Sequence, residues 1–322
     1  MAEAIVVHEL GGPEALRWEE VPDPTPGAGQ VRVRHTAVGL NFIDVYFRTG
    51  LYKGPVPFVP GQEAAGVVEA VGPGVVEVRP GDRVAYAGVQ GAYADVRIVP
   101  AARLVALPAE IDDRAAAAMM LKGMTAEYLL RRCARVARGD AIVFHAAAGG
   151  VGLIACQWAA HLGATVIGTV GSAEKARLAA AHGCAHVIDY TTEDVVARVR
   201  EITGGAGVPW VFDSVGRATY AASLECLRTR GTLALFGQSS GVVPPFDLGL
   251  LARGSTFVTR PSLRHYVETR DELLQSAAAL FDVVRSGAVK IEIGQTYPLA
   301  DAAAAHRDLE ARKTSGSTLL LP

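Results

Sequence analysis

One short segment, AAAGGVG at residues 146–152, has the composition and spacing to bind a phosphate group. Ala146, Gly149 and Gly152 give the pattern A-x-x-G-x-x-G between an apolar run, AIVFHA, and a helical pattern that starts LIACQW. Small residues let the backbone approach a pyrophosphate, and the following helix directs unpaired N–H groups and a positive dipole end at it. The segment therefore predicts a dinucleotide-binding turn, with a tight turn that binds no ligand as the alternative. The residues expected to contact the cofactor here are Ala147, Gly149, Gly150 and Val151.

The next apolar run, ATVIGTV, ends where the identity of the cofactor is usually decided. Sheets that bind NAD place an acidic residue about 20 residues after the glycine turn, where it binds the ribose 2′-OH. Gly171 and Ser172 stand at that position, and Glu174 is expected inside the next helix. Without the carboxylate, Ser172 and Lys175 can bind a 2′-phosphate, so we expect NADPH. Tyr190 is expected to add a hydroxyl to this phosphate site or to stack on the adenine, with a simple strand-end aromatic as the alternative.

Around this turn, the pattern of apolar runs predicts two domains. The N-terminal part consists of short apolar runs separated by Gly/Pro turns, which is typical of a mostly β domain. From Ala141 onward, strand-length runs alternate with helical segments, which predicts a doubly wound parallel sheet. A C-terminal helix and a last strand, GSTLLLP, are expected to pack back on the first domain. The predicted domains are a mostly β domain, residues 1–122 and 265–322, and an inserted nucleotide-binding domain, residues 123–264.

Composition excludes several other classes of protein. A chain of 322 residues is long enough for two domains, and half of its residues are hydrophobic. The formal charge of −2 does not favour nucleic acid or an anionic membrane surface as a partner. We see no signal peptide pattern at the N-terminus and expect a cytoplasmic protein. A disulfide framework or a four-thiolate zinc site is not expected from the four widely spaced cysteines, Cys133, Cys156, Cys184 and Cys226.

Several longer segments resemble one known family along essentially the whole chain. GQEAAGVVEAVGPGVVEVRPGDRVAYAG and GDAIVFHAAAGGVGLIACQ resemble signature blocks of the medium-chain dehydrogenases/reductases. Within that superfamily, these blocks and GLNFIDVYFRTGLY, LKGMTAEYLL, DSVG, FGQSSG and TRPSL are similar to the zinc-free quinone oxidoreductases of the zeta-crystallin type. One departure, Ala160 in place of a basic or polar residue, is interpreted as a surface change. The resemblance implies an α/β fold in which a doubly wound parallel Rossmann sheet is inserted in a mostly β GroES-like domain.

Two positions of this sequence argue against a catalytic zinc ion. The zinc-dependent relatives carry Cys and His where this chain has Asn41 and Gln62. Zinc needs thiolate, imidazole or carboxylate ligands, and amides are poor substitutes. His145 and His161 flank the glycine turn, but their setting indicates a strand and a helix rather than a metal site. We therefore expect no metal.

The resemblance also implies which residues form the site. Four residues are expected around the nicotinamide and the substrate: Asn41, Asp44, Tyr46 and Tyr52. Asn41 is expected to hydrogen-bond a carbonyl or the carboxamide, and Asp44 to be an orienting acceptor rather than an acid. The two tyrosines either flank a flat substrate or donate a proton, with packing as the alternative. Besides Asn41, further cofactor contacts are expected from Thr125, at the start of a helix, and from Ser214, Phe236, Gly237, Ser239, Ser240 and Arg260.

The predicted function is metal-free transfer of electrons from NADPH to a quinone in the cleft between the two domains. A quinone is electron-poor, so its reduction needs mainly proximity to the nicotinamide and solvent protons. The alternatives are an NADPH-dependent 2-alkenal or enoyl reductase, and an NADPH-binding sensor without turnover. We also expect a homodimer, because the run STFVTR at residues 255–260 can form an edge strand that pairs with a second copy.

Overall fold

The computed structural model describes residues 1–322, which divide into two compact units. The first unit comprises Met1–Met124, Val267–Arg285 and Ile291–Pro322, and the second comprises Thr125–Tyr266 and Ser286–Lys290. The sequence did not predict that the short segment Ser286–Lys290 belongs to the second unit. It is held there by Gln157, whose side-chain amide donates to the Lys290 carbonyl at 3.0 Å and accepts from the Lys290 N–H at 2.9 Å.

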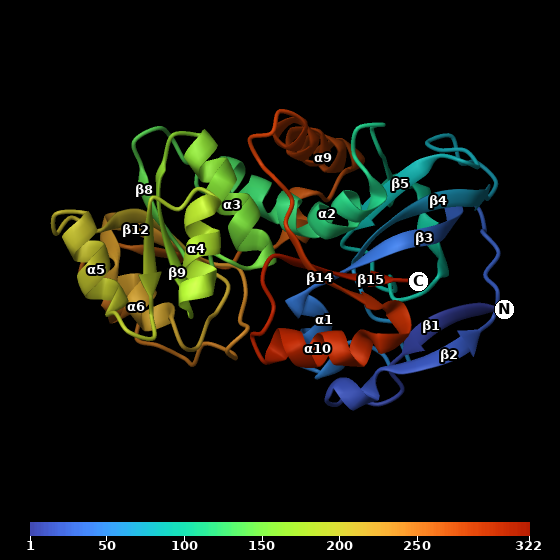
Figure 1. The fold of residues 1–322 in the computed structure, drawn as a ribbon, viewed down its shortest axis with the longest axis horizontal. Coiled ribbons are helices and arrows are strands. Elements are labelled where there is room, and N and C mark those ends of the chain that lie inside the picture. Colours follow the sequence, from blue (N-terminus) through green and yellow to red (C-terminus); the bar gives the residue numbers. More distant parts are fainter. The chain divides into compact units, whose positions relative to one another are not determined.

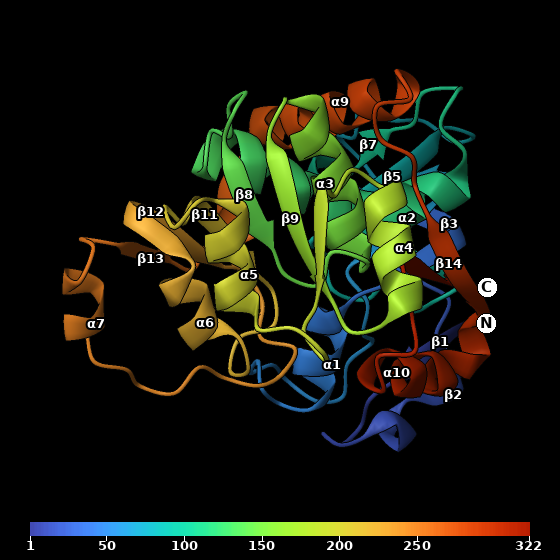
Figure 2. The same cartoon turned by 60° about the vertical axis from the view of Figure 1, so that its left-hand side comes forward.

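The second unit is built on one parallel six-stranded sheet (Figures 1 and 2). In spatial order, its strands are β10 (His186–Asp189), β9 (Thr165–Val170), β8 (Ala141–Phe144), β11 (Val208–Asp213), β12 (Leu227–Leu235) and β13 (Phe257–Thr259). Both faces are covered, which explains the uninterrupted apolar runs. Figures 1 and 2 show helices α3 (Gly150–His161) and α4 (Ala173–Ala181) on one face, and α5 (Val195–Ile202) and α6 (Tyr220–Glu225) on the other. The predicted doubly wound parallel sheet is confirmed.

The strand order in this sheet reverses between β8 and β11, and ligands of such sheets bind at the carboxyl ends of the strands near this reversal. Helix starts at this edge differ in their caps. Ser172 caps α4 and Asp194 caps α5 through side-chain oxygens. The residue before α3 is Gly149, which has no side chain to cap the first N–H groups. Those N–H groups therefore remain available to an anion.

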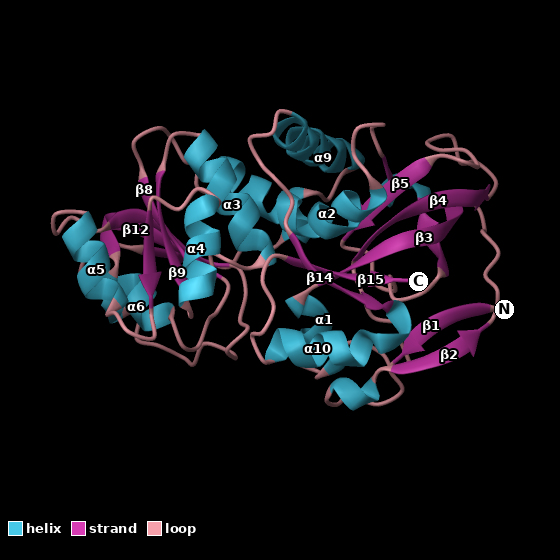
Figure 3. Cartoon of the chain, in the orientation of Figure 1, coloured by secondary structure: helices cyan, strands magenta, loops and turns pink.

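The first unit is mostly β (Figure 3). Its main sheet has the order β14 (Ile293–Pro298), β15 (Ser317–Leu321), β3 (Gln30–Leu40), β4 (Glu63–Val71), β5 (Arg83–Ala87) and β7 (Val105–Ala106), and β6 (Val96–Pro100) also pairs with β3. A separate hairpin is formed by β1 (Ala2–Val6) and β2 (Arg17–Val21). Alternate residues such as Val31 and Val33 point into a buried core, as expected for a strand with one face inside.

Six helices complete the chain: α1 (Phe42–Arg48), α2 (Asp113–Glu127), α7 (Gly249–Ala252), α8 (Leu263–Tyr266), α9 (Arg270–Arg285) and α10 (Ala302–Glu310). None of the helices in residues 1–322 combines the length and the apolar character needed to cross a membrane.

Helix α2 corrects one prediction, because Thr125 lies in its last turn and does not begin a helix. The alanine-rich segment upstream has high helix propensity, and Asp112 accepts the Ala115 N–H at 2.8 Å to start the helix. Gly123 does not break the helix. A Cβ there would lie 2.5 Å from a methyl group of Leu280, so the glycine makes room for α9. A π-helical turn, Tyr128–Cys133, follows.

Candidate active site

The glycine turn has the close packing that a dinucleotide site requires. Ala146 has a φ of 54°, in the left-handed region, and the turn closes through the Gly149 N–H, which donates to the Ala146 carbonyl at 2.9 Å. A Cβ at Gly152 would lie 2.3 Å from the carbonyl oxygen of Ala146 and 2.6 Å from that of Ala147. Only glycine allows α3 to begin this close to β8. The turn and the uncapped helix start together fit a pyrophosphate.

The residues expected to bind a 2′-phosphate come together at the ends of β9 and β10. A Cβ at Gly171 would lie 2.4 Å from the Tyr190 hydroxyl, so the missing side chain is what allows Tyr190 to lie here. The Ser172 hydroxyl accepts the Lys175 N–H at 3.3 Å, which places Ser172 and Lys175 in the same first turn of α4. Glu174 is also in this turn, as predicted, and is exposed. No acidic residue stands between the end of β9 and Glu174.

The segments after β11 and β12 also meet at this edge of the sheet. The Ser239 N–H donates to the Ser214 carbonyl at 3.1 Å, and a Cβ at Gly237 would lie 2.6 Å from that same oxygen. The Arg260 guanidinium lies 3.4 Å from the Gly237 carbonyl oxygen. The Phe236 N–H donates to the Asp213 carbonyl and the Ser240 N–H donates to the Val215 carbonyl, each at 2.9 Å. The structure thus brings these predicted residues together.

His145, in contrast, is part of the core of the second unit. It is buried, and its ring nitrogens lie 2.9 Å from the Thr169 hydroxyl and 3.0 Å from the Ser223 hydroxyl. Burial lowers the pKa of His145, so the ring is neutral at pH 7. A neutral ring with both nitrogens engaged has a structural role.

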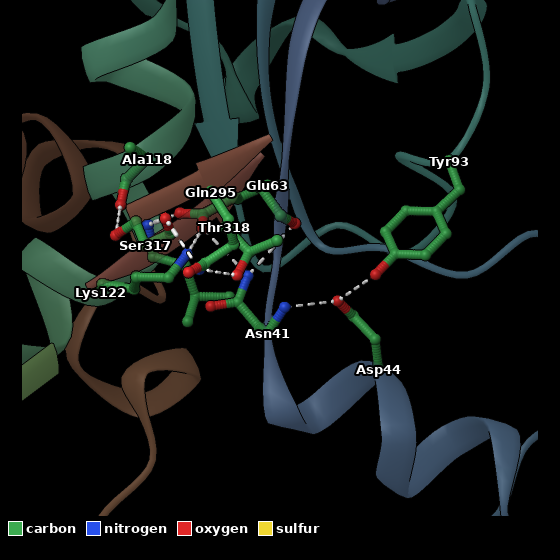
Figure 4. Close-up of polar contacts among 11 residues, drawn as sticks. Asn41, Asp44, Glu63, Tyr93, Ala118, Lys122, Gln295, Ser317 and Thr318 are labelled. Atoms are coloured by element: carbon green, nitrogen blue, oxygen red, sulfur yellow. Dashed lines mark hydrogen bonds and ion pairs between the residues drawn. The ribbon is translucent and has the colours of Figure 1, made fainter. Parts of the chain in front are cut away.

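In the first unit, Asn41 lies at the junction of β3 and α1, next to a buried ion pair (Figure 4). Its side-chain amide donates to Glu63 Oε1 at 3.0 Å and to the Gly39 carbonyl at 3.4 Å. Glu63 Oε1 also pairs with the ammonium group of Lys122. Both charged side chains are buried, with 0% of Glu63 and 5% of Lys122 exposed. The Leu121 N–H, which donates to Glu63 Oε2 at 2.6 Å, completes the hydrogen bonding of this carboxylate.

Asp44 is fully buried and is held by two donors. Its Oδ2 accepts the Asn41 backbone N–H at 2.9 Å and the Tyr93 hydroxyl at 3.0 Å (Figure 4), whereas Oδ1 has no hydrogen-bond partner. Burial raises the pKa of Asp44 to about 7, and the two hydrogen bonds act in the opposite direction. The sequence predicted an orienting acceptor rather than an acid. At a pKa of about 7, this carboxyl is protonated in a substantial fraction of the molecules at neutral pH.

A chain of hydrogen bonds continues from Tyr93 to the surface of the first unit. The Tyr93 hydroxyl lies 3.0 Å from His306 Nε2, and Arg48 lies 3.0 Å from His306 Nδ1. Arginine can only donate, so Nδ1 accepts, Nε2–H donates to Tyr93, and Tyr93 donates to Asp44. Burial lowers the pKa of His306 to about 3, which keeps it neutral. The chain ends at an ion pair of 2.7 Å between Arg48 and Glu310.

Tyr46 and Tyr52 lie next to each other in the first unit. Their ring centroids are 5.2 Å apart in an edge-to-face arrangement, and the Tyr52 N–H donates to the Tyr46 carbonyl at 3.0 Å. Tyr46 is buried and Tyr52 is half-buried. This contact is consistent with packing, and the roles that we assigned to the two rings stay predictions.

Comparisons with known proteins agree with this geometry. Residues 27–109 match the alcohol dehydrogenase GroES-like domain, and residues 150–279 match the family described as zinc-binding dehydrogenase. The chain is 50% identical to quinone oxidoreductase of Pseudomonas aeruginosa and 49% identical to 2-haloacrylate reductase of a Burkholderia species, over 100% of this chain and at least 99% of each relative. The crystal structure of Escherichia coli quinone oxidoreductase complexed with NADPH superposes with a TM-score of 0.98 at 49% identity, covering 100% of both chains.

The chain belongs to the quinone oxidoreductase family. The resemblance predicted from the sequence is thereby confirmed, including the combination of a GroES-like domain with a nucleotide-binding domain.

The positions that bind zinc in other branches of the superfamily are amides in this member of the quinone oxidoreductase family. The side chain of Gln62 donates to Gln90 at 3.1 Å, and that of Asn41 donates to Glu63. In residues 1–322, no group of three or more His, Cys, Asp or Glu side chains is arranged to hold a metal ion.

Sequence reasoning missed four residues that support the candidate site of this quinone oxidoreductase family member. Glu63 and Lys122 stood in the quoted blocks without a role, although Lys122 is one of only five lysines in the chain. Tyr93 and His306 were not considered at all. Their partners lie far away in the sequence, so no local pattern indicates them.

Proposed function

We propose that this protein reduces quinones with NADPH as the electron donor and without a metal ion. The observation that carries the proposal is the glycine turn, where Gly152 and the uncapped start of α3 fit a pyrophosphate. The family supports the same activity, because close relatives are named quinone oxidoreductases and one was crystallised with NADPH. NADPH, when bound, supplies the hydride, and the protein has to bind and orient the two reactants.

The cofactor contacts that we propose are those listed from the sequence. The turn from Ala147 to Val151 binds the pyrophosphate, and Ser172 and Lys175, with Tyr190, bind the 2′-phosphate. Further cofactor contacts along the same edge of the sheet are proposed for Ser214, Phe236, Gly237, Ser239, Ser240 and Arg260. Asn41 and Thr125 are proposed to contact the nicotinamide end. Asp44, Tyr46 and Tyr52 then surround the reacting groups.

Steady-state kinetics with a panel of quinones tests this function directly. We expect turnover with NADPH and a much higher KM for NADH. Metal analysis of the purified enzyme should find less than one zinc per chain. One tightly bound zinc, or a clear preference for NADH, would contradict the proposal.

A second candidate function is supported by one specific observation. The relative named 2-haloacrylate reductase is as similar to this chain as the E. coli quinone oxidoreductase, at 49% identity. Reduction of an activated carbon–carbon double bond uses the same cofactor and also needs no metal. Assays with 2-haloacrylates, 2-alkenals and quinones side by side distinguish the two functions. Tight NADPH binding without turnover of any acceptor would instead indicate a sensor.

We also propose the domain boundaries 1–122 with 265–322, and 123–264, a cytoplasmic location, and a homodimer. The dimer is supported by β13, an edge strand of the second unit on which Phe257 is 58% exposed and Val258 is 37% exposed. Two copies of such an edge can pair and cover these side chains. Light scattering should give twice the chain mass for the wild-type protein, and Phe257→Lys should shift the protein to monomer.

A further inference from the structure

The hydrogen bonds around Asn41 determine which kind of group this side chain can bind. A primary amide offers two N–H donors and one oxygen acceptor. Both donors are directed at protein acceptors, Glu63 Oε1 at 3.0 Å and the Gly39 carbonyl at 3.4 Å. A carboxylate and a carbonyl can only accept, so the NH₂ group, and not the oxygen, must face them. The amide oxygen faces the Asp44 N–H in the capping box at the start of α1, and its second lone pair keeps capacity for a donor on a ligand.

The buried ion pair makes this orientation stable. Lys122 forms an ion pair with Glu63 (Figure 4) in a buried site where a single charge would be costly. The Leu121 N–H donates to the other carboxylate oxygen at 2.6 Å and fixes it in place. A hydrogen bond to an ionised acceptor is stronger than one between neutral groups. Turning the Asn41 amide over would place its oxygen against this carboxylate, which is strongly unfavourable. The pair therefore holds Asn41 as an acceptor.

We propose that Lys122 and Glu63 are positioning residues that lock the Asn41 amide so that its oxygen accepts the carboxamide N–H of the nicotinamide. This rests on the proposed function, which places Asn41 beside the nicotinamide. An oxidised quinone has only acceptor oxygens, so its carbonyl cannot bond to this oxygen. The choice between a carbonyl and the carboxamide, which the sequence left open, is decided for the carboxamide. Asn41 thus orients the cofactor and does not polarise the quinone.

A cofactor analogue that lacks the carboxamide N–H provides the test. The 3-acetylpyridine analogue of NADPH carries a methyl ketone in place of the amide. Dissociation constants for NADPH and for the analogue are measured by fluorescence titration in the wild-type protein and in Asn41→Leu. The preference for NADPH is the Kd of the analogue divided by the Kd of NADPH. This ratio in the wild type, divided by the same ratio in Asn41→Leu, isolates the contact between Asn41 and the carboxamide N–H. For one neutral hydrogen bond, we expect this quotient to be about five-fold.

The role of the ion pair is tested with Glu63→Gln combined with Lys122→Met. Replacing both charges together avoids an unpaired buried charge. The NADPH preference should fall toward that of Asn41→Leu, because a neutral amide at position 63 no longer selects one orientation. If this double variant does not fold, Glu63→Asp gives the same measurement, since it keeps the charge but withdraws it from Asn41. Thr318→Val, which removes a neighbouring buried hydroxyl (Figure 4), is the matched control and should keep the wild-type ratio.

Three results would overturn the inference. Equal ratios in the wild type and Asn41→Leu would show that Asn41 does not accept the carboxamide N–H. An unchanged ratio in the double variant or in Glu63→Asp would show that the ion pair only joins β4 to α2. A ratio that also falls in Thr318→Val would mean that any disturbance nearby has the same effect. Turnover of quinones by the wild-type protein is recorded separately, so failure of the proposed function is distinguishable from failure of this inference.

Discussion

The buried carboxyl of Asp44 should make the stability of the first unit depend on pH in an unusual direction. Burial raises its pKa from the ordinary value of 3.8 to about 7. The folded state therefore holds a proton that the unfolded chain releases above pH 3.8. Because the folded state binds more protons in this range, the contribution of Asp44 to the free energy of unfolding falls as the pH rises from about 4 to about 7. A difference of about three pKa units corresponds to about 4 kcal/mol.

Asp44→Asn isolates this contribution. The amide has nearly the same shape, can accept the Asn41 N–H and the Tyr93 hydroxyl, and carries no charge at any pH. Urea unfolding of the variant and of the wild type is compared between pH 5 and pH 8. Relative to the wild type, the variant should gain about 3 kcal/mol across this range, since the wild type has already lost part of the contribution at pH 5. A difference that stays flat from pH 5 to pH 8 would refute the reasoning.

Tyr93→Phe should change the same pH dependence in the opposite sense. The Tyr93 hydroxyl stabilises the ionised carboxylate, and a hydrogen bond to a charged group is worth about 1.5–3 kcal/mol. Its removal should raise the pKa of Asp44 further, so the variant loses stability relative to the wild type mainly above pH 7. Tyr86→Phe is the matched control, because Tyr86 is equally buried but its hydroxyl contacts His35 and not Asp44.

Three further predictions concern the cofactor site and acid stability. Gly152→Ala places a Cβ 2.3 Å from a backbone carbonyl, so it should destabilise the protein by about 1–3 kcal/mol in urea unfolding and weaken NADPH binding; unchanged values would contradict the packing argument. Ser172→Ala with Lys175→Ala should raise the KM for NADPH about ten-fold and leave that for NADH unchanged; an equal rise for both would exclude a 2′-phosphate site. Burial lowers the pKa values of His35 to about 4 and of His306 to about 3, so each contributes stability above pH 6.5 that is lost as the pH falls. Each histidine should cost about 3 kcal/mol of the free energy of unfolding at pH 4. In acid unfolding, His35→Gln should lose less stability between pH 6.5 and pH 4 than the wild type.

The fold was largely predictable from local patterns. β8 is an uninterrupted apolar run next to the glycine turn, and from there onward strand-length runs alternate with helical segments. Helix α1 was not predicted, because its sequence FIDVYFR is rich in aromatic and β-branched residues that favour strands. Thr125 was misplaced for a related reason. Thr125 follows Gly123, a residue of low helix propensity that α2 nevertheless contains, because it packs against Leu280.

The candidate site was predictable only in part, since a pattern shows residue types but not which atoms they use. The glycine turn is local, so its geometry follows from seven consecutive residues. The environment of Asn41 is not local, because Glu63 is 22 residues away and the lysine that pairs with Glu63 is a further 59 away. From the sequence alone, Asn41 can donate or accept, and both roles were left open. Once both N–H groups are seen to face a carboxylate and a carbonyl, one role remains. The hydrogen-bond partners of a side chain in the folded protein therefore indicate which ligand group it can bind, and the sequence alone does not contain this information.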